Sequence, residues 1–465
     1  MAEETSKIEN DAVVDVEEPP YPSARYAWYV VGVLMVIYVF SFVDRQVMGL
    51  LVGPIKRDLD LSDTQMGLLM GTAFAVFYTL FGIPIGRLAD STSRRGLIAV
   101  GLILWSVMTT FCGLAKTFVQ FLMARMGVGV GEATLSPSAY SLIADYFPKE
   151  KLATAISVYG MGIYIGAGMA YLLGAVIIGF AGGAEMWTIP IVGEIRPWQI
   201  VFLIVGIPGI FVSAIMLTVK EPFRRGVKRI RGADGNLKAV SVPLAEVFGY
   251  MSANWKTFLT HNVGFAMLSF SSYGSGQWIP EFLIRNHGWE RETAGYWYGS
   301  MVMIGGVSGI VTGGRIADYL AKRGSRCSKM QAGVIAALVW APFGILYPIV
   351  ENQTLLLILI FGAVFTASMP FGAAPAAIQE MMPPRMRAQA SAIYLFVVNL
   401  IGLGLGPAVV GLVTDKVFGD EMSLRYSLLW VSTLAHIGAA FLLWRGLRSY
   451  ENSIDYLNKW SDSKA

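Results

Sequence analysis

GRLADSTSRR, from Gly86 to Arg95, returns as GRIADYLAKR, from Gly314 to Arg323, and this repeated phrase decides the fold. Each copy follows a long apolar run, carries one aspartate and closes with two cations. The copies lie 228 positions apart in a chain of 465 residues. A second pair, PKEKLATAISVY from Pro148 and PPRMRAQASAIY from Pro383, shares the first proline, two alanines and the final tyrosine. The chain therefore contains two similar halves, a pattern typical of secondary transporters that rock two membrane-embedded repeats around a central site.

The composition is that of a membrane protein. Hydrophobic residues make up 55% of the chain, charged residues make up 15%, and the mean hydropathy is +0.55, whereas soluble domains carry roughly 25% charged residues. The two cysteines, Cys112 and Cys327, fall in different halves, and the three histidines are scattered, so the sequence predicts no disulfide framework, metal site or cofactor. A basic run within 220–254 is interpreted as a linker held by anionic headgroups, not as a nucleic-acid site.

Twelve apolar runs are long enough for a spanning helix, which needs about 20 residues. We therefore predict an all-α membrane protein with twelve transmembrane helices in two pseudo-symmetric six-helix bundles. A polar segment over 183–197 is expected to be an outer loop that can form a small hairpin. The predicted spans are 26–53, 64–89, 95–115, 118–147, 151–182, 198–219, 255–284, 293–321, 329–350, 353–382, 386–417 and 424–445.

Cation placement predicts the orientation, because lysine and arginine accumulate in cytoplasmic loops. With the N-terminus inside, the inner loops and tails hold 26 of the 36 cations and the outer loops hold eight. The first 25 residues carry seven carboxylates and no early apolar core, so we do not expect them to act as a signal peptide. The predicted domains are a disordered cytoplasmic tail over 1–25, an N-terminal bundle over 26–219, a cytoplasmic linker over 220–254, a C-terminal bundle over 255–446 and a cytoplasmic tail over 447–465.

Four charged residues stand out deep inside predicted spans, where charge is expensive and usually functional: Asp44, Arg45, Arg125 and Glu132. Arg125 and Glu132 are two helical turns apart and share one face. Asp44 lies roughly 15 Å and Arg125 roughly 12 Å from the outer ends of their helices, so the two can pair if these helices are neighbours. A buried carboxylate beside a cation can bind and release a proton. We predict Asp44 and Glu132 as proton carriers and Arg125 as the switch; the alternative is a static ion pair.

The repeated phrases predict a gate at the cytoplasmic ends of the helices. Each aspartate can pair with cations and helix N-termini when the inside is closed, and separate from them when it opens. In the alternative interpretation, the cations only fix the orientation. The predicted gate residues are Asp90, Arg94, Arg95, Asp318, Lys322 and Arg323.

Polar side chains in otherwise apolar spans predict a substrate site. The seventh span, with SFSSYGSGQWIPEFLIR from Ser269, is polar enough to line a cavity, while the second half carries almost no intramembrane charge. This asymmetry favours an amphiphilic substrate, with its polar end near the charges of the first half. Single tyrosines in such spans are more often structural than ligand contacts. The predicted substrate-binding residues are Arg45, Tyr78, Tyr164, Tyr273, Gln277 and Asn399.

The twelve-span plan and the duplicated phrases resemble the major facilitator superfamily. The family phrase usually has a cation directly after the aspartate, where this chain has Ser91 and Tyr319. Within the superfamily, VDR at 43–45, RMGVGVGEA at 125–133 and IADYFP at 143–148 resemble the Spinster group. The resemblance implies proton-linked export or exchange of lipid-like molecules, such as the sphingosine-1-phosphate and lysophospholipids that eukaryotic members handle. It also implies functional roles for Asp44, Arg125 and Glu132, and the short loops suggest a bacterial member in the inner membrane.

The sequence thus predicts a monomeric, proton-coupled transporter with alternating access, surrounded by membrane lipids and carrying a lysophospholipid-like or sphingolipid-like substrate. A carrier of small organic anions, with Arg45 or Arg125 as the anion contact, and a multidrug exporter are the alternatives within the class. A receptor or channel is the alternative from another class. A membrane enzyme would need a clustered catalytic set, and no such set or ATP-binding phrase is visible, so we predict no enzymatic activity.

Overall fold

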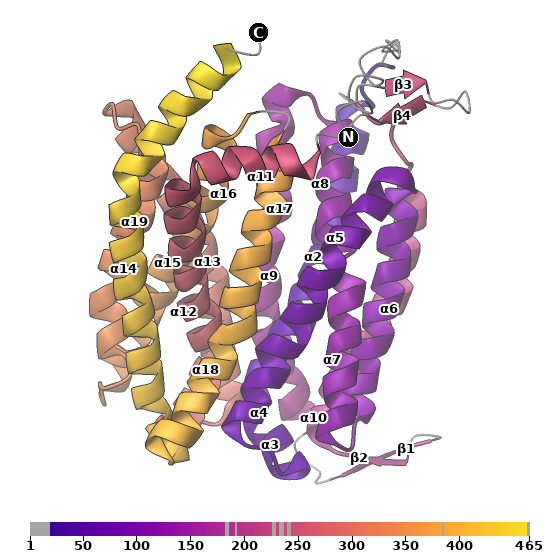
Figure 1. The fold of residues 1–465 in the computed structure, drawn as a ribbon. Coiled ribbons are helices and arrows are strands. Elements are labelled where there is room, and N and C mark those ends of the chain that lie inside the picture. The colour runs from indigo at the N-terminus through magenta and orange to yellow at the C-terminus, as the bar shows by residue number, and fades with distance from the viewer. Residues whose placement is uncertain are drawn as a thin grey trace.

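The computed structural model describes residues 19–181, 186–190, 193–225, 229–231, 237–239, 243–383 and 386–462, and almost all of them are helical (Figure 1). The first half runs through α2 (Ala24–Gln46), η1 (Val47–Leu50), α3 (Val52–Leu59), α4 (Asp63–Gly67), η2 (Leu68–Thr72), α5 (Ala73–Ser91), α6 (Arg94–Leu114), α7 (Phe118–Glu132), α8 (Leu135–Tyr146), α9 (Lys149–Ala181), β1 (Trp187–Ile189), β2 (Gly193–Ile195), α10 (Pro197–Val212) and η3 (Ser213–Thr218).

A short strand pair, β3 (Arg229–Arg231) and β4 (Leu237–Ala239), and the helix α11 (Leu244–Ala253) connect the halves. The second half runs through α12 (Trp255–His287), α13 (Arg291–Lys322), α14 (Ser328–Leu346), α15 (Gln353–Ser368), α16 (Pro370–Met381), α17 (Arg387–Val398), η5 (Asn399–Leu405), α18 (Gly406–Leu412), η6 (Val413–Phe418), η7 (Glu421–Ser423) and α19 (Leu424–Asp462).

The helices form two bundles that stand side by side in Figure 1, indigo to magenta for the first half and rose to yellow for the second. Ten of the described helical segments are long and apolar enough to span a membrane. The two remaining predicted spans correspond to α7–α8, which is interrupted at Ala133 and Thr134, and to α12, which is rich in hydroxyl and amide side chains. Buried polar residues lower the mean hydropathy of both segments, which is why they are absent from the ten. Together with them the structure has twelve spans, and the predicted twelve-helix architecture is confirmed.

The two ends of the bundle differ in what they carry. Both ends of the described chain and α11 lie at one end, which we call the terminal end, while α3, α4 and the β1–β2 hairpin lie at the other, which we call the distal end (Figure 1). The hairpin pairs Trp187 with Ile195 and Ile189 with Gly193, so the expected hairpin forms. The predicted disordered tail over 1–25 lies mostly outside the described residues.

The last helix continues well beyond its predicted span. The sequence places the end of this span at residue 445, but α19 runs as one helix to Asp462. Its extension is docked on the second half, because the buried Tyr450 hydroxyl donates to Glu380 Oε2 (2.6 Å) and Ser453 shares a hydrogen bond with Thr257 (2.7 Å). Hydropathy does not predict this extension, because residues 446–462 are rich in charged side chains and only a few of them are buried against the second half.

Glycines bring the two halves into backbone contact at the distal end. A Cβ atom at Gly67 would lie 2.4 Å from the carbonyl oxygen of Pro407, and a Cβ atom at Gly71 would lie 2.4 Å from that of Leu403. Gly71 lies in η2, a π-helical segment that packs against the π-helical η5 of the other half. Small residues allow such close crossings of helices in lipid. The distal end is therefore closed in this structure by contacts that tolerate no side chain.

Gly71→Val is expected to force the distal ends apart, because overpacking a tight contact costs about 1–3 kcal/mol. Spin labels at Lys116 and Gln353, which are exposed at the distal ends of opposite halves, report the separation by electron–electron double resonance. We expect a population with a longer distance. Gly82→Val is the matched control, because a Cβ atom at Gly82 meets nothing within 4 Å. Equal distance distributions for both variants would contradict the prediction.

Candidate functional site: a buried charge core beside an aromatic pocket

A buried ion pair between the first and fourth spans forms the centre of the site. Arg45 Nε and Nη2 both lie 2.6 Å from Glu132 Oε2, and the Ser41 hydroxyl donates to the same oxygen. Arg45 stands in the last turn of α2 and Glu132 is the last residue of α7. Glu132 is 0% exposed and Arg45 is 5% exposed. Breaking a buried ion pair from one side is costly, since it leaves the other charge without compensation.

Aromatic rings enclose the Arg45 guanidinium. Its central carbon lies 4.9 Å from the ring centre of Phe42, 4.5 Å from that of Phe74 and 4.9 Å from that of Tyr78. The Arg125 guanidinium lies 5.6 Å from the same Phe74 ring. Cation–π attraction is strongest in desolvated sites such as this one. The rings therefore hold both arginines within the membrane-spanning part of the first half.

Asp44 and Arg125 lie close together, but their side chains do not form the ion pair that the sequence allowed. Arg125 Nη1 donates to the backbone oxygen of Asp44 (3.3 Å), and its Nε donates to that of Leu69 (3.2 Å). Asp44 Oδ2 accepts a hydrogen bond from Thr109 (3.1 Å). Asp44 and Arg45 are neighbours on a helix, so their side chains point about 100° apart. Asp44 therefore faces α6, and Arg45 is the cation that reaches Glu132.

Three buried polar atoms of this group have no hydrogen-bond partner within the described part of the chain. They are Asp44 Oδ1, Arg125 Nη2 and Glu132 Oε1. We call Asp44, Arg45, Arg125 and Glu132 the charge core. It is electrically balanced when all four side chains are ionised, and each unpartnered carboxylate oxygen is a position at which a proton can be added. The arrangement can thus change its charge without a bound cofactor.

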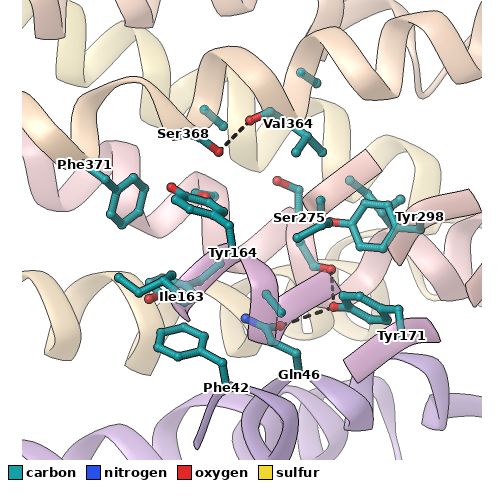
Figure 2. A pocket seen from close by; sticks show the side chains of 18 of the residues that line it. Phe42, Gln46, Ile163, Tyr164, Tyr171, Ser275, Tyr298, Val364, Ser368 and Phe371 are labelled. Carbon is teal, nitrogen blue, oxygen red and sulfur yellow. Dashed lines mark hydrogen bonds between the residues drawn. The ribbon is translucent and has the colours of Figure 1, made fainter. Parts of the chain in front are cut away.

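A pocket lies between the two halves, next to the charge core (Figure 2). Phe42 and Gln46 of α2 line one side, while Ser368 and Phe371 of the second half line the opposite side, and Tyr164 of α9 projects between them. Eight of the lining side chains are aromatic and none is charged. Its cavity volume is about 80 Å³, so a larger ligand can enter only if the halves separate further. Phe42 contacts both the pocket and Arg45, which joins the two parts of the site.

The predicted substrate residues fall into three groups. Tyr164 and Tyr273 line the pocket. Tyr78 stacks on Arg45, and Gln277 donates its amide to the backbone oxygen of Arg45 (3.3 Å). Asn399 begins η5, its amide donates to the carbonyl oxygen of Leu395 in the preceding α17 (2.9 Å), and it does not line this pocket.

Sequence reasoning missed two lining residues that bind each other. The Tyr171 hydroxyl lies 3.2 Å from Gln46 Oε1 and 3.0 Å from the carbonyl oxygen of Gly276, so it bridges the halves (Figure 2). One signal was available for Gln46, because it directly follows two charged residues inside a predicted span. Tyr171 had no such signal among the other tyrosines.

The two repeated phrases differ in their surroundings at the terminal end. Arg94 is fully buried and pairs with Asp145 (2.5 Å) and Glu221 (2.7 Å), while Arg95 donates to the carbonyl oxygen of Val219 (3.0 Å). In the second copy, Asp318, Lys322 and Arg323 are all exposed. Arg323 stacks on Tyr319 (4.5 Å). The side chain of Asp90 lies outside the described residues.

The first phrase is thus part of a charge network within its own half. Burial alone would raise the pKa of the Glu221 carboxyl, but hydrogen bonds from Arg94, the Arg95 backbone and Ser93 lower it below its ordinary value. In the second half, Glu380 stands three residues before the echoed proline, as Asp145 does in the first, and pairs with Lys329 (2.9 Å). Each half therefore fixes its terminal end with an ion pair at related positions.

Glu221 is expected to stabilise the fold in a pH-dependent way. Its folded pKa is lowered, so its contribution is complete above the ordinary glutamate pKa of about 4.3 and is lost as the pH falls through the folded pKa. Glu221→Gln should lower the thermal unfolding temperature in detergent at neutral pH, and the difference should shrink toward about pH 3. Glu290→Gln, at an exposed glutamate, is the control. A difference that grows on acidification would contradict this prediction.

A third charge cluster, which sequence reasoning missed, joins the halves at the distal end. Arg285 binds both carboxylate oxygens of Asp63 (2.7 and 2.9 Å), which also accepts from Lys56 (2.8 Å). Glu281 pairs with Arg285 (2.9 Å) and Arg291 (3.4 Å). We call these five residues the distal lock. From the sequence these cations have only a topological role, because nothing in it shows that Asp63, in the first half, and Glu281, in the second, lie together.

The inter-half contacts described above cluster toward the distal end. Besides the distal lock, Thr64 donates to Asp415 (2.6 Å) and Thr72 donates to the carbonyl oxygen of Gly404 (2.6 Å). The Arg291 guanidinium also donates across the interface to the carbonyl oxygen of Leu50 (2.6 Å). The pocket and the charge core therefore lie behind a closed distal end.

Comparison with known proteins agrees with this architecture. Residues 34–407 match the Major Facilitator Superfamily. An MFS-type efflux pump of Mycolicibacterium smegmatis is 29% identical, with 95% of this chain and 98% of that protein covered. Protein spinster homolog 1 of Xenopus tropicalis is 25% identical, with 90% and 81% covered.

A solved structure gives the same result. It is the crystal structure of a bacterial homologue of the human lysosomal transporter Spinster in an inward-facing, unoccupied conformation, with 28% identity, 94% of this chain and 99% of that chain covered, and a TM-score of 0.74. The predicted resemblance to the Spinster group is thus confirmed. The chain, with its two six-helix bundles and the site between them, belongs to the Major Facilitator Superfamily of membrane transporters and is of the Spinster type.

Proposed function

We propose that this transporter uses a proton gradient to move a lipid-like or amphiphilic substrate, acting as a monomer in a bacterial inner membrane with both termini in the cytoplasm. The observation that carries the proposal is the fully buried Arg45–Glu132 pair beside an uncharged aromatic pocket between the halves. In the proposed orientation the terminal end is cytoplasmic, and a closed distal end corresponds to the inward-facing state.

Proton coupling is supported by how Glu132 is bound. Two nitrogens of Arg45 and the hydroxyl of Ser41 donate to its Oε2, while its Oε1 has no hydrogen-bond partner among the described residues. A proton added at Oε1 neutralises the carboxylate and removes most of its attraction for Arg45. The guanidinium can then shift while still in contact with aromatic rings, and it becomes available to another anion. Asp44, with one bonded and one unpartnered oxygen, is a second proton acceptor next to Arg125.

An amphiphile is supported by the placement of charge. The four residues of the charge core belong to the first half, whereas the second half contributes aromatic rings and serine hydroxyls to the pocket. An anionic or zwitterionic headgroup would lie toward Arg45, and an apolar chain would lie against the rings of Tyr273 and Phe371. The outward movement of such a molecule would reduce its concentration in the cytoplasmic leaflet.

Of the two alternative substrates, one is favoured by a specific observation. The similarity to an efflux pump over nearly the whole chain favours a multidrug exporter, for which an aromatic pocket without charge is equally suitable. A small organic anion would use Arg45 but would leave most of the aromatic lining without a role.

Flux into proteoliposomes separates these substrates. Labelled lysophospholipid, a lipophilic cationic dye and a labelled sugar acid are each offered with and without an imposed pH gradient. The proposal expects lysophospholipid flux that the gradient accelerates at least about tenfold, and little flux of the sugar acid. Acceleration of the dye alone would favour the exporter. Lysophospholipid flux that ignores the gradient would contradict proton coupling and leave the substrate assignment standing.

A further inference from the structure

One face of α12 follows the first half from the charge core to the distal lock. Gln277, Glu281 and Arg285 are spaced by four residues, so they lie one above another on the helix. Each contacts the first half. The Gln277 amide donates to the Arg45 carbonyl (3.3 Å), Glu281 accepts from the Gly53 amide (3.3 Å), and Arg285 binds Asp63 (2.7 Å). Side chains on a single helix face thus contact both charge clusters.

The contact at Gln277 lies on the residue that carries the charge-core cation. Gln277 is 1% exposed and binds the backbone of Arg45, while the side chain of Arg45 binds Glu132. The backbones are also close here, because a Cβ atom at Gly49 would lie 2.7 Å from the Gln277 carbonyl oxygen. The Gln277 contact therefore depends on the position of the α2 backbone at Arg45. It does not involve the charged side chain of Arg45.

The segment between these contacts is suited to local movement. Between Arg45 and Gly53 the chain passes through η1, a 3-10 helix whose hydrogen bonds are weaker than those of an α-helix. Tyr171 adds a contact at the same level, because its hydroxyl lies within hydrogen-bond distance of both Gln46 Oε1 (3.2 Å) and the carbonyl oxygen of Gly276 (3.0 Å). A shift of Arg45 on losing Glu132 would therefore move α2 and η1 against α12 at this point.

We propose that Gln277 is a positioning residue that couples the charge core to the distal lock through the Gln277–Glu281–Arg285 face of α12. The proposal rests on the alternating-access function proposed above and adds the link between its two charge clusters. When Glu132 releases Arg45, the carbonyl of Arg45 moves away from Gln277. The loss of this contact lets α12 withdraw Glu281 and Arg285 from Gly53 and Asp63. Neutralising Glu132 thus weakens the distal lock, although Glu132 itself contacts none of the five residues that form it.

The test measures how strongly Glu132→Gln shifts the ratio of distal-open to distal-closed protein. The full chain in lipid nanodiscs carries spin labels at Lys116 and Gln353, and the two native cysteines are buried. With Gln277 present, Glu132→Gln should shift the ratio about tenfold, a typical allosteric coupling. In a Gln277→Met background the shift should fall below about twofold.

Gln199→Met is the matched control background. Gln199 is also buried, and its amide also donates to a backbone carbonyl, that of Ala115 (3.4 Å), but this contact lies within the first half. The shift should stay about tenfold in this background. The inference is overturned if Gln277→Met keeps the full shift, if Gln199→Met loses it equally, or if Glu132→Gln causes no shift with all other residues native.

These outcomes are separate from the fate of the proposed function. The distance measurement needs neither a substrate nor a gradient. A shift that only Gln277→Met abolishes supports the inference even if vesicle flux proves independent of protons. Proton-driven flux without such a shift overturns the inference and leaves the proposed function intact.

Discussion

Glu132→Gln is expected to lower gradient-driven transport at least about 100-fold while leaving exchange across vesicles without a gradient within about threefold of wild type. The substitution removes the titratable group yet keeps the shape of a protonated glutamate, so Arg45 stays in its released state. Losing one member of a buried ion pair costs about 3–5 kcal/mol. Each 1.4 kcal/mol changes an equilibrium constant by about a factor of ten. Uptake of labelled lysophospholipid into proteoliposomes, with and without a pH gradient, measures both quantities.

Retained exchange separates loss of coupling from loss of folding. Glu290→Gln, an exposed glutamate before α13, should leave both activities unchanged. Asp44→Asn tests the second carboxylate in the same assay and should reduce gradient-driven transport less, because Asp44 accepts a hydrogen bond from Thr109 and forms no ion pair with any described residue. Gradient-driven uptake by Glu132→Gln within twofold of wild type would show that the pair has only a structural role.

Asp63→Arg is expected to open the distal end. The new cation would face Lys56 and Arg285, both within 3 Å of the carboxylate that it replaces. Asp63 is 0% exposed, so water does not screen the repulsion between the three cations. We expect the substitution to destabilise the distal-closed state by about 3 kcal/mol or more. That corresponds to a shift of at least about 100-fold toward the distal-open state. Distances between labels at Lys116 and Gln353 report this shift directly.

Two further variants make the result specific. Arg285→Asp added to Asp63→Arg restores an attractive pair with exchanged charges, and it should recover much of the closed population. Asp455→Lys reverses one member of the Arg326–Asp455 pair, which is about half-exposed at the terminal end. Exposed pairs contribute only about 0–1 kcal/mol, so this control should not change the distal distance. An unchanged distance in Asp63→Arg would exclude the lock as a conformational determinant.

Much of the fold could be predicted from periodic apolar runs, because a membrane forces every spanning segment to be long, apolar and helical. The duplicated phrases add the arrangement in two halves. The helix α19 shows the limit of this argument, because its extension past residue 445 depends on contacts of Tyr450 with another helix and not on hydropathy. The interruption of α7–α8 at Ala133 and Thr134 leaves a similarly weak trace in the sequence.

The site was partly predictable for a related reason. Charges in apolar surroundings are conspicuous, so all four residues of the charge core could be found from the sequence. Which charges pair could not be found, because it depends on which way adjacent side chains such as Asp44 and Arg45 point. The distal lock was missed because Asp63 and Arg285, 222 positions apart, resemble ordinary loop charges until the halves are brought together.

The unequal division of the site between the halves has a consequence for how such proteins can diversify. The residues of the charge core all belong to the first half, while Tyr273, Tyr298, Trp340 and Phe371, from the second half, shape the pocket. Mutations in the second half can therefore alter the lining of the pocket while the residues of the charge core remain unchanged. The two halves of a repeated plan are thus unequal in this chain, because the first half holds the buried charges and the second half can reshape its side of the pocket without altering them.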